Sequence, residues 1–150
     1  MAGASFTRDL RVPATPEQAW AVVTDVERLA SWVELLEKVE EIAPLESYET
    51  VLADRLGPFK LRADLAVTLT DVIEGRQLRV HAEGEDRQVA SRIMIDALLT
   101  IQPEESGCTV VVDGSYDVAG RVATLGASVI AKKADHLLDV FFTRTEEALS

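Results

Sequence analysis

Hydrophobic and polar residues alternate along most of the chain, and this two-residue period predicts β-strands. The alternation begins near Phe6 and recurs between residues 38 and 118, in segments separated by short turns at 57–59, 74–76 and 103–107. Strands joined by such short turns pair antiparallel. The positions predicted to share the apolar face are Phe6, Leu10, Leu61, Ala63, Leu65, Val67, Leu69, Leu78, Val80, Ala82, Ile93, Ile95, Ala97, Leu99, Ile101, Cys108, Val110, Val112 and Tyr116.

Helical periodicity occurs in two regions. After the first strand, Thr15, Pro16 and Gln18 form a capping box with a first-turn proline, and Asp25 can cap a second short helix that ends near Leu36. Toward the carboxyl end, residues 119–142 predict one long helix whose second half is amphipathic.

The first half of that last helix has small residues and almost no charge. Its apolar positions are Val122, Leu125, Val129 and Ile130, and we expect these to face the sheet. Gly126 falls in the middle, where a glycine costs about 1 kcal/mol relative to alanine. Small residues there allow either close packing on the sheet or a cavity, and both alternatives remain open.

Together these elements predict an α+β fold in one domain spanning residues 1–150. A curved antiparallel sheet of about seven strands wraps around the long C-terminal helix, which is the only large element able to cover the apolar face of the sheet. Two short helices follow the first strand.

Composition and charge narrow the function classes. The net charge of −11 argues against nucleic-acid binding and against adhesion to anionic membranes through a polybasic patch. One cysteine, Cys108, excludes an internal disulfide and a cysteine-based metal cluster. With no signal peptide visible and no apolar run of about 20 residues, we expect a cytoplasmic protein.

Candidate catalytic chemistry is sparse. His81 and His136 are both predicted to face solvent, Cys108 is predicted to be a buried apolar residue, and no acid–base pair follows from spacing. We therefore assign no catalytic residue, metal site or cofactor. A binding protein is favoured over an enzyme, and the question of catalysis stays open.

Three stretches resemble known families. The segment "VPATPEQAWAVVTDVERLASW" resembles the start of START-like polyketide cyclase/lipid-transport (SRPBCC) domains. The segments "ETVLADRLGPFKLRADLAVTLTDV" and "DVAGRVATLGASVIAKKADHLLDVFF" are similar to the family of the carbon monoxide dehydrogenase G subunit. The resemblance implies a helix-grip fold with a deep hydrophobic cavity between sheet and C-terminal helix. It also implies carriage of a quinone-type lipid and the maturation or membrane recruitment of a molybdenum hydroxylase.

On this resemblance the expected ligand is a hydrophobic small molecule, with a partner enzyme and transient peripheral contact with a membrane. Trp32, Phe59 and Tyr116 are candidates for the cavity entrance, and Arg55 or Arg92 for a polar head group. The expected ligand-binding residues are Trp32, Phe59, Leu65, Val67, Leu69, Ile93, Ile95, Val110, Val112, Tyr116, Leu125 and Val129.

Two alternatives remain. A cyclase, aromatase or hydrolase could use the same cavity, but it needs inward polar residues, and only Ser128 and Tyr116 are candidates unless the strand phase is shifted by one to bring in Asp96. A ligand-free interaction module would instead have a filled core and an exposed apolar patch at residues 119–131.

Overall fold

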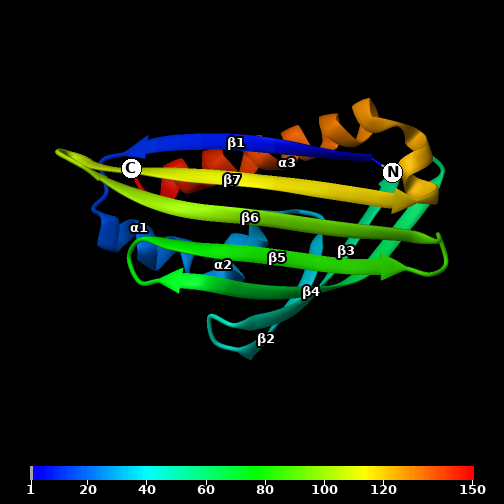
Figure 1. Ribbon diagram of the computed structural model, residues 1–150, viewed down its shortest axis with the longest axis horizontal. Coiled ribbons are helices and arrows are strands. Elements are labelled where there is room, and N and C mark those ends of the chain that lie inside the picture. Colours follow the sequence, from blue (N-terminus) through cyan, green and yellow to red (C-terminus); the bar gives the residue numbers. More distant parts are fainter. Residues whose placement is uncertain (1) are drawn as a thin grey trace.

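A computed structural model describes residues 2–150 and contains one seven-stranded antiparallel sheet in the order β1-β7-β6-β5-β4-β3-β2, with α3 lying behind it (Figure 1). The predicted helix-grip architecture is confirmed. The elements are β1 (Ala2–Val12), α1 (Pro16–Val23), α2 (Val26–Ser31), β2 (Leu36–Ala43), β3 (Ser47–Leu56), β4 (Phe59–Ile73), β5 (Gln77–Asp86), β6 (Ser91–Glu104), β7 (Gly107–Gly120), the 3-10 helix η1 (Arg121–Leu125) and α3 (Ala127–Ala148).

Local hydrogen bonds explain where the two short helices begin. The Thr15 hydroxyl accepts from the Gln18 amide at 3.2 Å, and the Gln18 side chain accepts from the Thr15 amide at 2.9 Å, which confirms the capping box. The Asp25 carboxylate accepts from the Arg28 amide and caps α2. Helix α2 is shorter than predicted, because its C-cap is Trp32, whose ring packs edge-on against Phe141 of α3.

The strand phase follows the sequence. Residues predicted to share one face occupy matching positions across the ladder: Leu69 pairs with Val80, Val80 with Ala97, and Leu99 with Val112. This inner face is directed toward α3, whereas the outer face carries polar residues such as His81 and Asp96. Because one face of the alternating strands is buried, the pattern itself specifies the register.

The predicted last helix is instead two elements. Strand β7 continues to Gly120, η1 forms one short 3-10 turn, and the chain changes direction at Gly126 before α3 begins. Gly126 has φ 96° and ψ 153°, a conformation that is essentially restricted to glycine. The expectation of a mid-helix glycine is therefore wrong, and Gly126 is the hinge between η1 and α3.

The core is divided into two buried clusters. One, the α1 cluster, packs α1 and the end of α3 against one half of the sheet; it contains Val12, Ala19, Val22, Val23, Tyr48, Leu69, Leu78, Leu99, Ile101, Cys108, Val110, Val112 and Leu149. The other, the η1 cluster, packs η1 and the start of α3 against the opposite half; it contains Leu61, Ala63, Leu65, Ile93, Val118, Val122 and Ile130.

Candidate ligand-binding site

A belt of half-buried apolar residues crosses the inner face between the two clusters. We call it the central belt; it consists of Phe6, Val67, Val80, Ile95, Ala97 and Tyr116. The register makes the belt continuous, since Ala97 pairs with Val80 and Ile95 pairs with Tyr116. Each of these six side chains packs against one of the two clusters but remains half-buried, although inward apolar side chains in the middle of a sheet are normally the most buried in a domain.

Small residues form the floor of this region. Ala82 and Ala97 occupy neighbouring positions of β5 and β6, and Gly114 follows on β7. The Phe6 ring lies over Gly114. A Cβ atom added at Gly114 would be only 2.5 Å from that ring, so no larger residue fits at this position.

Helix α3 is buried at its two ends and less so between them. Ile130 near its start and Thr145 near its end are buried, while Leu137, Leu138 and Phe141 in between are half-buried. These three side chains lie between the two anchoring points of the helix. The middle of α3 and the central belt are therefore both only half-buried.

Two ion pairs link α3 to the sheet, one to β1 and one to β3. On the β1 side, Arg8 lies 3.4 Å from Asp135. On the β3 side, Lys133 Nζ lies 3.0 Å from Asp54 Oδ2, an oxygen that accepts no well-directed hydrogen bond from residues 2–150. The Asp54 side chain is only 17% exposed. Arg8 and Asp54 are charged residues at inward positions of their strands, and the sequence did not lead us to expect them near the site. A charged residue on the apolar face of an alternating strand was the pattern that could have identified them.

Burial changes the chemistry of two inward groups. It raises the pKa of the Tyr116 phenol, with a further contribution from the negative charge of Asp135, so the hydroxyl stays protonated and can donate a hydrogen bond. Burial likewise raises the pKa of the Cys108 thiol, which keeps the thiolate fraction low and argues against a nucleophilic role.

The structure separates the twelve residues expected at the ligand into three groups and one exception. Leu65, Leu69, Ile93, Val110 and Val112 are buried within the clusters; Val67, Ile95 and Tyr116 belong to the central belt; Trp32, Phe59 and Leu125 are half-buried beside the clusters. Val129 does not face the sheet as expected, because the turn at Gly126 resets the helical phase and leaves Val129 44% exposed. Ser128 is also exposed.

The two arginines proposed for a head group point away from the belt. Arg55 follows the inward Asp54 on β3, and Arg92 precedes the inward Ile93 on β6, so both lie on the outer face. The alternation of inward and outward positions along these two strands already predicted that both arginines face outward.

Surface depressions occur elsewhere. One of about 460 Å³ lies mainly on the outer face of β1, β7 and β6, beside Asp96 and Asp117; another of about 300 Å³ lies between α2 and β2. Both are open to solvent, and neither lies between the sheet and α3.

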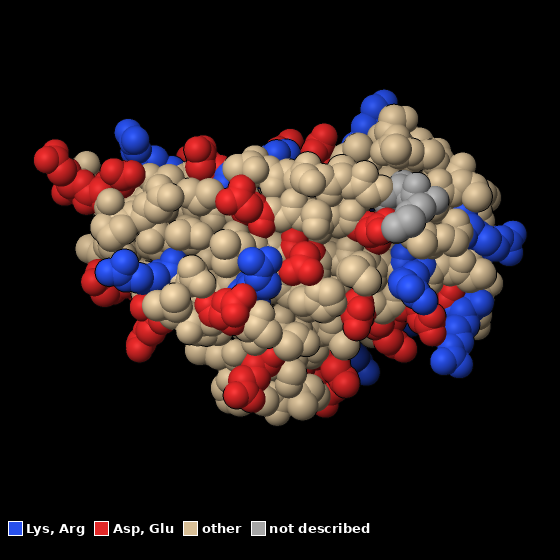
Figure 2. Space-filling view, in the orientation of Figure 1, with Lys and Arg blue, Asp and Glu red and all other residues tan. Residues whose placement is uncertain are grey.

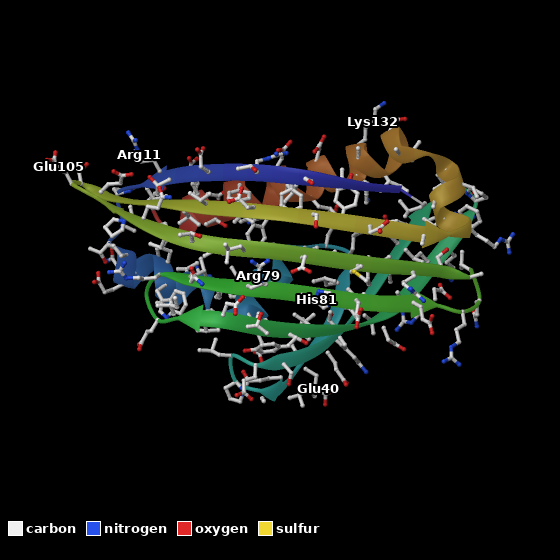
Figure 3. All side chains as sticks on the ribbon, in the orientation of Figure 1. Arg11, Glu40, Arg79, His81, Glu105 and Lys132 are labelled. Atoms are coloured by element: carbon white, nitrogen blue, oxygen red, sulfur yellow. The ribbon has the colours of Figure 1, made fainter. Side chains whose placement is uncertain are left out.

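The outer face carries a charged network around His81, which Figure 3 shows beside Arg79 on β5. His81 Nδ1 lies 3.0 Å from Asp96 Oδ2, and Nε2 lies 3.5 Å from Glu83. The hydrogen bond to Asp96 raises the histidine pKa. Within residues 2–150 no set of three or more His, Cys, Asp or Glu side chains is arranged to hold a metal ion.

The sequence comparison decides the family. Residues 9–150 match CoxG, the G subunit of carbon monoxide dehydrogenase. The chain belongs to this family. None of the curated proteins matches it. In the described part of this CoxG-family protein, no helix combines the length and apolarity needed to cross a bilayer.

Solved structures show the same fold at low sequence identity. A conserved protein from Geobacillus kaustophilus superposes with a TM-score of 0.80 at 19% identity, covering 99% of this chain and 95% of that chain. A protein from Thermus thermophilus gives a TM-score of 0.69 at 17% identity, covering 97% of each chain. Ara h 8.0201 gives a TM-score of 0.65 at 10% identity, covering 99% of each chain. At these identities the likenesses show that the fold is shared.

Proposed function

We propose that this CoxG-family protein binds an apolar small molecule between the central belt and the middle of α3, and acts as an accessory carrier. The observation that carries the proposal is the division of the core: two well-packed clusters enclose a region in which Val67, Val80, Ile95 and Ala97 are only half-buried. A folded domain normally fills its centre, so incomplete packing at this place supports a space reserved for a ligand.

The chemistry of the belt selects the class of ligand. Its side chains are aliphatic or aromatic, and the phenol of Tyr116 is its one hydrogen-bonding side chain. A mostly apolar molecule with a single carbonyl or hydroxyl group fits this composition, and a prenylated quinone has that character. Burying about 300 Å² of ligand surface contributes roughly 7 kcal/mol before the cost of association is subtracted.

The family supports an accessory role. It is named for a subunit of carbon monoxide dehydrogenase, and we infer that the partner is an enzyme of the molybdenum hydroxylase type. The ion pairs at both edges of α3 favour a helix that can be displaced during ligand exchange, because each pair is partly exposed and of modest strength.

Native mass spectrometry of freshly purified protein, followed by organic extraction, tests the proposal. We expect a co-purifying lipid or quinone, and saturable quenching of Trp20 and Trp32 fluorescence when a short-chain naphthoquinone is added to extracted protein. Replacing Tyr116 with Phe should weaken quinone binding several-fold while leaving a pure hydrocarbon probe unaffected. Absence of both a bound lipid and quinone binding would contradict the proposal.

A further inference from the structure

Basic residues of this protein are concentrated at one end of the fold (Figure 2). Three segments meet at one end, which we call the η1 end: residues 54–62, 85–93 and 117–133. Hydrogen bonds join them: the Arg62 amide donates to the Asp86 carboxylate Oδ2 at 2.8 Å, and the Arg121 amide donates to the Ala90 carbonyl at 3.1 Å. The Leu125 side chain also reaches the β3–β4 turn at Gly57.

The η1 end is basic although the protein is acidic. Its three segments contain eight Lys and Arg residues against four Asp and Glu, whereas the rest of the chain contains seven against 22. Figure 2 shows blue side chains gathered at the right-hand end of the molecule, where the N-terminus and the start of α3 lie in Figure 1. Lys132 is at that end, and Glu105 is at the opposite tip (Figure 3).

Most of the acidic groups at the η1 end are already engaged. Asp86 is buried and accepts backbone hydrogen bonds from Arg62, Gln88 and Val89. Asp54 pairs with Lys133, and Glu85 pairs with Arg87. Five exposed cations form no ion pair with any residue of the described chain: Arg55, Lys60, Arg92, Arg121 and Lys132. The η1 end therefore presents uncompensated positive charge.

Exposed apolar residues lie among these cations. Val129, at the start of α3, is 44% exposed, and Pro58 is exposed at the tip of the β3–β4 turn. Apolar side chains surrounded by Lys and Arg are typical of surfaces that enter the interface of an anionic bilayer, where the cations meet phosphates and the apolar groups meet the upper acyl region.

We propose that the η1 end docks on the phosphate headgroups of an anionic lipid bilayer. This rests on the proposed function, because a carrier of an apolar molecule must exchange its cargo with a lipid phase. The net charge of −11 does not oppose docking in this orientation. Strand β6 alone has 14 residues and spans about 45 Å, so the acidic residues at its far end, Glu104 and Glu105, lie several Debye lengths from the bilayer at physiological salt.

Vesicle sedimentation tests the docking surface. The wild-type protein and a Lys60→Glu, Arg92→Glu, Lys132→Glu variant are mixed with phosphatidylcholine vesicles with or without 30% phosphatidylglycerol as the probe. Arg121 is kept, because its guanidinium stacks over the Phe59 ring at 5.8 Å. The control variant, Arg11→Glu, Arg76→Glu, Arg144→Glu, makes the same change in net charge with exposed arginines outside the η1 end. The matching Gln variants replace either set if reversal impairs folding.

We expect wild-type protein to sediment only with the anionic vesicles and to be released at high salt. Each cation near the bilayer surface raises the partition coefficient onto anionic vesicles roughly fivefold. The partition coefficient of the η1-end variant should therefore fall about a hundredfold, and that of the control variant should stay within a few-fold of wild type. The docking proposal is overturned if wild-type protein does not sediment with anionic vesicles, or if both variants lose binding equally. It is also overturned if the η1 end binds an acidic protein but no vesicles. Quinone binding measured without vesicles reports separately on the proposed function.

Discussion

Replacing Ala97 with Phe tests whether the centre of the fold is a ligand space or a packed core. Ala97 lies in the middle of the inner face, between Val80 and Gly114 in the ladder, and is half-buried. A phenylalanine adds about 100 Å² of apolar surface, so placing it in unfilled space should stabilise the fold by roughly 2 kcal/mol. Inserting it into a packed core should destabilise the fold by about 1–3 kcal/mol. The two alternatives differ in sign.

Thermal and urea unfolding measure that sign, and Ala66→Phe is the matched control. Ala66 is exposed on the outer face of β4, so the same substitution there buries little and should change the melting temperature by less than about 2 °C. We expect Ala97→Phe to keep or raise the melting temperature, by roughly 2–4 °C for each kcal/mol in a chain of this size.

Ligand binding gives the second half of this test. The added ring should occupy the space between the belt and α3, and naphthoquinone affinity should fall at least tenfold relative to wild type and Ala66→Phe. Destabilisation of about 3 kcal/mol with unchanged quinone affinity would refute the reasoning, because it would show that the belt is packed and the ligand binds elsewhere.

Three further predictions follow from local geometry. Gly126→Ala should lower the unfolding free energy by about 1–3 kcal/mol, through backbone strain alone, because no atom lies within 4 Å of the added Cβ. The pKa of His81 is raised in the folded state, so its pair with Asp96 stabilises the fold fully below pH 6.5. That stabilisation is lost as the pH rises through the folded-state pKa. The difference in unfolding free energy between wild type and His81→Gln should therefore shrink from about pH 5.5 to 8.5 in urea titrations. Lys133→Met should cost about 1 kcal/mol, and Asp54→Asn in the same protein should recover part of it in a double-mutant cycle.

The sheet was predictable because a single period specifies it. Each strand has one apolar face. A shift of one residue in the pairing register would turn buried residues such as Leu65 and Leu99 toward solvent, so the sequence is compatible with only one register. The capping signals at Thr15 and Asp25 were equally local, since each involves contacts within three residues.

The start of α3 was not predictable in the same way. Residues 119–142 predict a single helix, but two glycines, Gly120 and Gly126, adopt backbone conformations with positive φ that no periodicity reveals, and α3 begins only after the second. That single turn changed the side of α3 on which Val129 lies, and with it one of the expected site residues. Helical phase is propagated from wherever the helix starts, so an error in the start rotates every later assignment.

Net charge describes the chain as a whole and hides how the charges are distributed in the fold. The cations of the η1 end come from three segments that are far apart in the sequence and adjacent only in the fold, where Arg62 and Arg121 meet the β5–β6 turn. An average of −11 over the chain conceals a basic end and a strongly acidic remainder. Because electrostatic attraction acts over about one Debye length, the local charge of the surface that faces a partner decides the interaction, so net charge alone does not predict whether this end meets an anionic membrane.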